Sequence, residues 1–156
     1  MRTLEDFSVG GSITLGNYVM THREIVEFAS RYDPQPFHTD SDHDLTKTLG
    51  GLIASGWHTA SVYMRLAVDA YMSDTAVLTS PGVDDLQWLQ PVRVGDTLTG
   101  DVTVLSIRAS RSKPDRGILE TRGVLRNQHG HTVFSLTAKA FVKTRAGLST
   151  DTLKSS

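Results

Sequence analysis

The sequence contains no cysteine among its 156 residues, so disulfide bonds, thiolate catalysis and cysteine-ligated metal sites are excluded. It also lacks a long apolar run: no stretch approaches the ~20 residues that a membrane-spanning helix needs. The opening residues MRTLEDFSVG carry acids where a signal peptide needs an apolar segment. We therefore expect a cytoplasmic protein that does not associate with membranes.

An excess of one charge sign is also missing. The chain has 16 basic and 17 acidic residues, for a net charge of −1. Nothing in this balance would recruit nucleic acid or an anionic membrane surface by bulk charge. The length suits a single domain over residues 1–156, and we expect its small, polar C-terminal segment from about residue 145 to be flexible.

The first half of the chain has helical patterns. The segment THRE has the form of a capping box, with Thr21 as the N-cap and Glu24 three residues later. Pro34 disfavours helix at the preceding residue and should end this element. An apolar face follows the cap at helical spacing, and it consists of Ile25, Phe28, Ala29 and Tyr32.

Two more helices are expected before the strands begin. Ser41 is a candidate N-cap for a short helix through DHDLTKTL. A longer helix should follow the glycines of GGLIASG. The apolar face predicted for this longer helix consists of Trp57, Ala60, Met64, Ala67, Val68 and Tyr71.

The second half of the chain alternates apolar and polar residues with a period near two. This pattern predicts strands in TLTGDVTVLSI, ILETRGVLR and HTVFSLTAKAFVK. The segments 113–117 and 127–130 separate them as turns, so neighbouring strands should pair antiparallel. A long apolar helix needs a surface to cover it, and the combination predicts an α+β domain.

The segment DPQPFH is the first candidate for chemistry. Pro34 and Pro36 fix two φ angles between Asp33 and His38, which stiffens the connection. A carboxylate and an imidazole held in a fixed relation are sufficient for general base and general acid catalysis near neutral pH. The alternative interpretation is structural, because aspartate before proline commonly opens a turn and a single loop histidine is usually solvated.

The same segment resembles the D-x-N-P-x-H signature of the MaoC-like dehydratases, or hydratase 2 family, with Gln35 in the place of the family's asparagine. GGLIASGWHTASV is similar to the segment that opens the family's central helix, and PGVDDLQWLQPVRVGDTL to the strand after that helix. SRSKPDRGILETRGVLRNQHG resembles a hairpin of one bacterial branch. Together these segments, in the family's order, extend the resemblance over most of residues 5–143.

The resemblance implies a hotdog fold, in which a curved antiparallel sheet wraps one long central helix, and a homodimer or a dimer of dimers. It also implies reversible addition of water to a trans-2-enoyl thioester of coenzyme A, forming an (R)-3-hydroxyacyl thioester, with no cofactor besides the coenzyme A of the substrate. Asp33 would then be the base and His38 the proton donor. The backbone N–H of Gly56 would bind the thioester oxyanion.

Further residues are expected to bind the substrate. Pro36, Ser55 and Trp57 lie in the segments that carry the resemblance, next to the candidate catalytic residues. Arg111 and Lys113 belong to a basic hairpin that we expect to meet the phosphates of coenzyme A. Charge reversal at Arg111 should then raise KM for the thioester and leave kcat nearly unchanged.

Two departures from the family concern the support of Asp33. Ser55 stands where the family often has histidine before the oxyanion glycine. Met64 aligns with a serine that supports the catalytic carboxylate in some members, and a thioether cannot donate that hydrogen bond. We expect Ser61 or Gln35 to hold Asp33 instead.

Other functions were weighed against this one. Hotdog thioesterases commonly take a carboxylate from the long helix, where this chain has only Asp69, late in the helix. A non-catalytic acyl-thioester-binding subunit is the other alternative. A metal site is not expected, because DSDHD lacks the glycine of a calcium loop and the histidines near it do not complete a zinc spacing.

Overall fold

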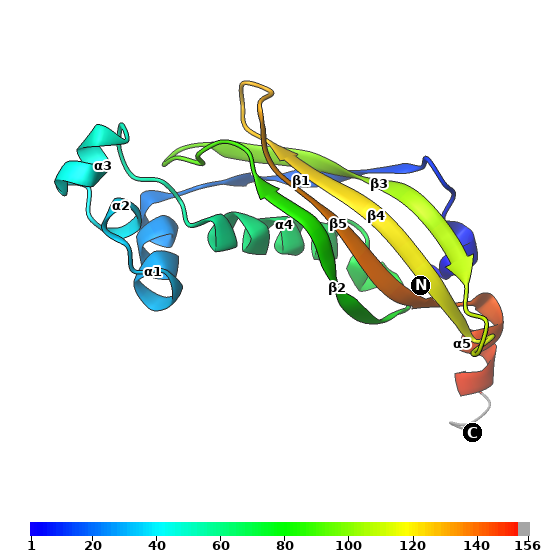
Figure 1. Ribbon diagram of the computed structural model, residues 1–156. Helices are drawn as coiled ribbons and strands as arrows, with labels where there is room; N and C mark the ends of the chain where they lie inside the picture. Colours follow the sequence, from blue (N-terminus) through cyan, green and yellow to red (C-terminus); the bar gives the residue numbers. More distant parts are fainter. Residues whose placement is uncertain (153–156) are drawn as a thin grey trace.

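A curved antiparallel sheet wraps one long helix in the computed structural model, which describes residues 1–152 of the chain (Figure 1). Helix α4 lies along the concave face of the sheet, α1 to α3 gather at one end, and α5 lies at the other end. The strands are β1 (Ser12–Val19), β2 (Val77–Trp88), β3 (Thr97–Ala109), β4 (Arg116–Arg126) and β5 (Thr132–Lys143). The helices are α1 (His22–Tyr32), α2 (Pro36–Thr39), α3 (Asp44–Thr48), α4 (Gly56–Ala70) and α5 (Arg145–Thr152), with 3-10 turns η1 (Leu4–Asp6) and η2 (Met72–Asp74).

The five strands follow the order β1-β3-β4-β5-β2. The three predicted strands are confirmed as β3, β4 and β5, and they are joined by hairpins at the predicted turns. The alternating pattern does not indicate β1, which forms one edge of the sheet. The other edge is β2, in the segment that resembles the family's strand after the central helix.

Helix α4 begins after the glycine-rich segment as predicted, but the predicted apolar face is right only in part. Ala67 and the C-cap residue Tyr71 are buried in the core, as expected. Trp57, Met64 and Val68 are 58%, 47% and 36% exposed. The buried face consists of His58, Thr59, Val62, Tyr63, Leu66 and Ala67. Because α4 carries apolar residues on most of its circumference, period alone cannot select the buried side.

Close packing of α4 against the sheet depends on a glycine in β4. A Cβ atom at Gly123 would lie 2.2 Å from the Tyr63 hydroxyl oxygen and 2.3 Å from the ring. The Tyr63 ring also packs on Phe134 of β5, with the ring centroids 5.4 Å apart. The absence of a side chain at position 123 therefore allows α4 to bury this tyrosine.

The ends of the helices that precede α4 are determined by residues close to them in the sequence. Thr21 caps α1 and its hydroxyl oxygen accepts the N–H of Glu24, which confirms the predicted N-cap; the Glu24 carboxylate accepts the Thr21 hydroxyl in return. The helix ends at Tyr32 before Pro34, also as predicted. The prediction for Ser41 is wrong, because α3 begins later and the side chain of His43 caps it.

The C-terminal segment begins with α5, whose first residue is tied to the N-terminal region. The backbone N–H of Arg145 donates to the Glu5 carboxylate, and the Arg145 guanidinium pairs with Asp6 at 2.9 Å. The remainder of the segment predicted to be flexible, residues 153–156, lies outside the described residues.

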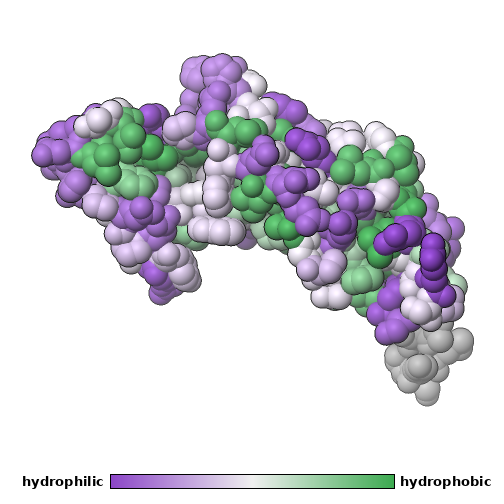
Figure 2. All heavy atoms as spheres, viewed as in Figure 1, coloured by the Kyte–Doolittle hydropathy of each residue, from purple (hydrophilic) through white to green (hydrophobic). Residues whose placement is uncertain are grey.

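No helix in the described part of the chain is long and apolar enough to cross a membrane. Figure 2 shows apolar side chains gathering near α3, a region in which Leu45 and Leu49 are exposed.

Candidate active site

Asp33 and His38 lie on a connection with little conformational freedom. Asp33 is the C-cap residue of α1, and Pro36 is the first residue of the short helix α2, a position that favours proline. His38 therefore belongs to a helical turn, where the sequence had predicted an open, stiff loop. The two prolines still fix the chain between the acid and the imidazole.

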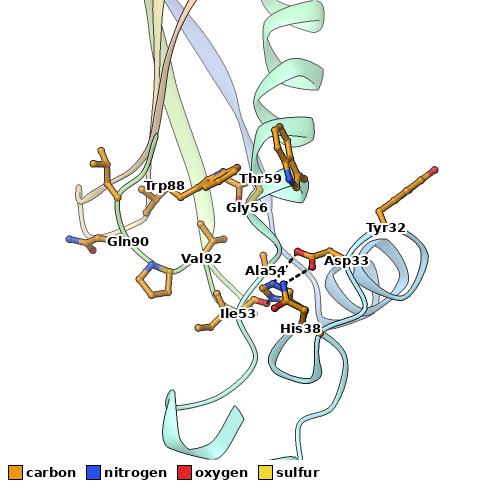
Figure 3. Close-up of a pocket in the computed structure, with 15 residues that line it drawn as sticks. Tyr32, Asp33, His38, Ile53, Ala54, Gly56, Thr59, Trp88, Gln90 and Val92 are labelled. Carbon is orange, nitrogen blue, oxygen red and sulfur yellow. Dashed lines mark hydrogen bonds and ion pairs between the residues drawn. The ribbon is translucent and has the colours of Figure 1, made fainter. Parts of the chain in front are cut away.

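The two side chains meet at the edge of a cavity (Figure 3). The Nε2 atom of His38 lies 3.3 Å from Oδ2 of Asp33. The other ring nitrogen, Nδ1, lies 2.5 Å from the carbonyl oxygen of Ile53. Because a carbonyl only accepts hydrogen bonds, Nδ1 carries a hydrogen, and Nε2 is the nitrogen that can exchange a proton with Asp33 or a ligand.

Two neutral side chains hold the Asp33 carboxylate. Gln35 Nε2 donates to Oδ1 and Ser55 Oγ donates to Oδ2, each at 2.7 Å. The hydrogen bonds from Gln35 and Ser55, with a smaller effect of the His38 charge, outweigh burial and hold the pKa of Asp33 below its usual value. Asp33 is therefore a carboxylate at neutral pH.

The expected support of Asp33 is confirmed for Gln35 and wrong for Ser61. The hydroxyl of Ser61 donates to the backbone carbonyl of Trp57 at 2.8 Å, within its own helix. Met64, which stands at the position of the family serine, is 47% exposed. The second support instead comes from Ser55, which the sequence had suggested only as a substrate contact.

The N-terminus of α4 lies beside the pair, because Gly56 is its first residue and Ser55 its N-cap. No backbone hydrogen bond among the described residues uses the N–H of Gly56. The first N–H groups of a helix have no partner within the helix and carry partial positive charge. This end of α4 therefore offers a fixed donor to an oxygen that acquires negative charge.

Trp88, the last residue of β2, packs directly on Gly56. Its indole Nε1–H donates to the Gly56 carbonyl at 2.8 Å, and its ring meets Trp57 edge to face with the centroids 5.2 Å apart. A Cβ at position 56 would lie 2.4 Å from the indole. Glycine is thus required here by the tryptophan.

These elements enclose a cavity of about 590 Å³. Figure 3 shows the segment from Trp88 to Val92 across the cavity from Asp33 and His38. The lining is partly apolar and partly polar, and it includes Tyr32, Asp33, Gln35, His38, Ile53, Ala54, Gly56, Trp57, Thr59, Trp88, Leu89, Gln90, Pro91, Val92 and Val133. A carboxylate–imidazole pair, a helix N-terminus and an apolar wall therefore share one space.

The remaining residues predicted for the site are not all brought together. Ser55 is fully buried beside the cavity, with its hydroxyl occupied by Asp33. Pro36 is exposed and does not line the cavity. Arg111 and Lys113 lie on the β3–β4 hairpin, at the end of the sheet away from α1 and the start of α4 (Figure 1). They do not reach this cavity within their own chain.

Two contributors were missed from the sequence. The Ile53 carbonyl sets the protonated nitrogen of His38, and backbone groups leave no signal in residue type. Trp88 stands in a segment that carries the family resemblance, but its bond to Gly56 spans 32 residues and has no sequence signal. For metals, the described residues contain no group of three histidine, aspartate or glutamate side chains that could hold an ion.

Comparisons with known proteins agree with this architecture. The family model described as "MaoC like domain" matches residues 8–122. The crystal structure of the MaoC-like dehydratase from Rhodospirillum rubrum is 39% identical, with a TM-score of 0.83 over 93% of this chain and 99% of that one. The R-hydratase PhaJ1 from Pseudomonas aeruginosa is 20% identical, with a TM-score of 0.71 over 92% of this chain and 86% of that one.

A sequence relative extends over nearly the same range. The uncharacterized protein YdeM of Bacillus subtilis is 24% identical over 140 residues, which cover 90% of this chain and 98% of that protein. The family model accounts for most of the chain, including the loop with Asp33 and His38 and the whole of α4. The chain belongs to the MaoC-like dehydratase family and has its hotdog fold.

Proposed function

We propose that the protein hydrates trans-2-enoyl-CoA thioesters to (R)-3-hydroxyacyl-CoA, and catalyses the reverse dehydration. The observation that carries this proposal is the Asp33–His38 pair, 3.3 Å apart, on a cavity that also contains the N-terminus of α4. A base, an acid and an oxyanion donor are the groups that this reaction needs. The family provides the reaction class, and the R-hydratase among the similar structures is consistent with it.

Water would bind between Asp33 and His38. As its oxygen bonds to the β-carbon, one of its protons passes to Asp33, and the electron pair of the double bond moves toward the thioester carbonyl. The α-carbon takes the proton from Nε2 of His38, which enters the reaction as the imidazolium and keeps its Nδ1 hydrogen on the Ile53 carbonyl. The proton on Asp33 then returns to Nε2, 3.3 Å from Oδ2, and both residues regain their starting states.

Negative charge accumulates on the thioester oxygen during this step. The N–H of Gly56 would donate to that oxygen, assisted by the partial positive charge at the start of α4. Trp88 fixes the peptide group on the other side of Gly56 through its carbonyl. The acyl chain would pack along Trp57 and Trp88, which form an edge-to-face aromatic wall of the cavity.

Neither alternative function gains support from the site. Asp69, the carboxylate of α4, pairs with Arg65 at 2.7 Å near the other end of the helix, away from the cavity. A thioesterase would therefore lack its helix carboxylate here. A purely binding role was suggested by the missing support for Asp33, and Gln35 and Ser55 supply that support.

The proposed active unit is a homodimer. Strand β2 is an edge strand and most of its residues are exposed. An unpaired edge of this length is a ready template for a second chain. In such a dimer the basic hairpin with Arg111 and Lys113 would serve the coenzyme A of the partner's site, because it lies far from the cavity of its own chain.

The experiment measures loss of the enoyl-thioester absorbance with crotonyl-CoA and longer trans-2-enoyl-CoAs. Asp33→Asn and His38→Ala should each reduce the rate by at least ~10²-fold. Asp69→Asn is the matched control and should retain the wild-type rate. Release of free thiol without hydration would replace the proposal with thioester hydrolysis, and absence of both signals would leave a binding role.

A further inference from the structure

Ser55 uses its side chain in an unusual way for a helix N-cap. An N-cap serine ordinarily accepts a hydrogen bond from an N–H of the first helical turn. In α4 the Ser55 side chain makes no such bond. Its hydroxyl instead donates to Asp33, 22 residues earlier in the chain, at 2.7 Å. The residue is fully buried, so its hydroxyl has no contact with bulk solvent in this structure.

The backbone of the same residue supplies the start of α4. The Ser55 carbonyl accepts the N–H groups of His58 and Thr59. The peptide bond from Ser55 to the next residue carries the N–H of Gly56, which is the first residue of α4 and lines the cavity. One residue therefore touches the candidate base with its side chain and carries the candidate oxyanion donor on its peptide bond.

We propose that Ser55 is a positioning residue that fixes the Asp33 carboxylate relative to the Gly56 N–H. This inference rests on the proposed function. Ser55 takes the place of the helix serine that the resemblance implied at position 64, where an exposed methionine stands. Ser55 thus acts through Asp33, and it is not a direct substrate contact.

The geometry explains why two donors are needed. Gln35 holds Oδ1, while Oδ2 faces both Ser55 and the imidazole of His38. His38 is the only titratable side chain that the described contacts place on Asp33. Without the Ser55 hydroxyl, Oδ2 would keep only the 3.3 Å contact to His38, and the carboxylate plane would be free to turn. Small displacements of a catalytic group reduce rates steeply.

The test compares Ser55→Ala with Ser61→Ala, a matched serine within α4 whose hydroxyl donates to the Trp57 carbonyl. Ser55→Ala should lower kcat with crotonyl-CoA by about 10- to 10²-fold with little change in KM. The acidic limb of its pH profile should move to higher pH, because a donor that favours the Asp33 carboxylate is lost. Ser61→Ala should match wild type. Should Ser55→Ala not fold, Ser55→Cys, which retains the side-chain size with a weak donor, carries the same test.

A second readout separates this inference from the proposed function. Carboxyl ¹³C NMR of labelled aspartate, assigned with Asp33→Asn, reports the Asp33 titration without turnover. A raised pKa in Ser55→Ala supports the positioning contact even if wild type hydrates no enoyl thioester, which would refute the reaction alone. An Asp33 titration and pH profile equal to wild type, with or without a loss of kcat, would overturn the inference.

Discussion

Substituting Gly56 by alanine tests the contact that joins the start of α4 to the end of β2. The added methyl group would lie 2.4, 2.6 and 2.7 Å from Cε2, Cδ2 and Nε1 of Trp88. Distances this short require the indole to move. The indole is held by its hydrogen bond to the Gly56 carbonyl and by its edge-to-face contact with Trp57. Movement therefore breaks or weakens both interactions.

The magnitude follows from these contacts. Overpacking of one methyl group typically costs about 1–3 kcal/mol. Loss of the indole hydrogen bond adds about 1 kcal/mol. The better helix propensity of alanine returns up to about 1 kcal/mol, because Gly56 already has no positive φ. The net loss is about 2 kcal/mol, or about 4–8 °C in Tm for a chain of this length.

A double-mutant cycle isolates the cause. Gly56→Ala, Trp88→Ala and the double variant are unfolded by heat and by urea, and their free energies of unfolding are compared with wild type. In the Trp88→Ala background, Gly56→Ala should be neutral or slightly stabilising, because the atoms that it meets are gone. Equal destabilisation in both backgrounds would refute the steric explanation.

Three further predictions concern other parts of the fold. His58 is buried and its pKa is lowered by burial, so the unfolded chain binds a proton that the folded chain resists. The free energy of unfolding, measured with urea, should therefore fall as pH drops below about 6.5. The fall should be smaller in His58→Phe than in wild type. Gly123→Ala should destabilise the protein by about 1–3 kcal/mol through its clash with Tyr63, and a thermal midpoint equal to wild type would contradict this. The Arg93 guanidinium donates to the Leu49 and Gly51 carbonyls, so Arg93→Met should lower the free energy of unfolding by about 1–2 kcal/mol. It should also speed hydrogen exchange of the backbone amides near residue 50, and exchange rates equal to those of wild type would contradict this.

Local patterns predicted the elements that depend on nearby residues. The N-cap at Thr21 and the helix end before Pro34 are set within a few positions, and both are confirmed. The hairpins from β3 to β5 follow from alternation and turn residues, which are local as well. The buried face of α4 was predicted only in part, because Trp57 and Met64 are as apolar as the residues that meet the sheet, and only the tertiary fold distinguishes them.

The candidate site shows the same division. Asp33 and His38 are five positions apart, so sequence spacing nearly determines their meeting. The contacts that hold and shape the site connect distant segments: Ser55 reaches Asp33 across 22 residues, and Trp88 reaches Gly56 across 32. No periodicity encodes such pairs. The sequence therefore indicated the candidate catalytic groups, while their supports required the structure.

The basic hairpin provides a test of how two chains share a site. Strand β3 starts at the end of the sheet near α1 and runs 13 residues to the hairpin, roughly 40 Å along the strand. If Arg111 binds coenzyme A, it does so in a partner's site. Arg111→Glu should then raise KM for crotonyl-CoA about tenfold or more with kcat nearly unchanged. An unchanged KM would remove Arg111 from substrate binding.

Mixed dimers of Arg111→Glu and Asp33→Asn subunits distinguish the two arrangements. The Asp33→Asn subunit has an inactive base and an intact Arg111, whereas the Arg111→Glu subunit has an intact base. If the arginine acts across the interface, the one active site of the mixed dimer contains both intact groups, and its KM returns to the wild-type value. If the arginine acts within its own chain, the active site keeps the altered residue and KM stays high. Recovery of KM would establish that each site takes residues from two chains, and persistent elevation would refute the exchange.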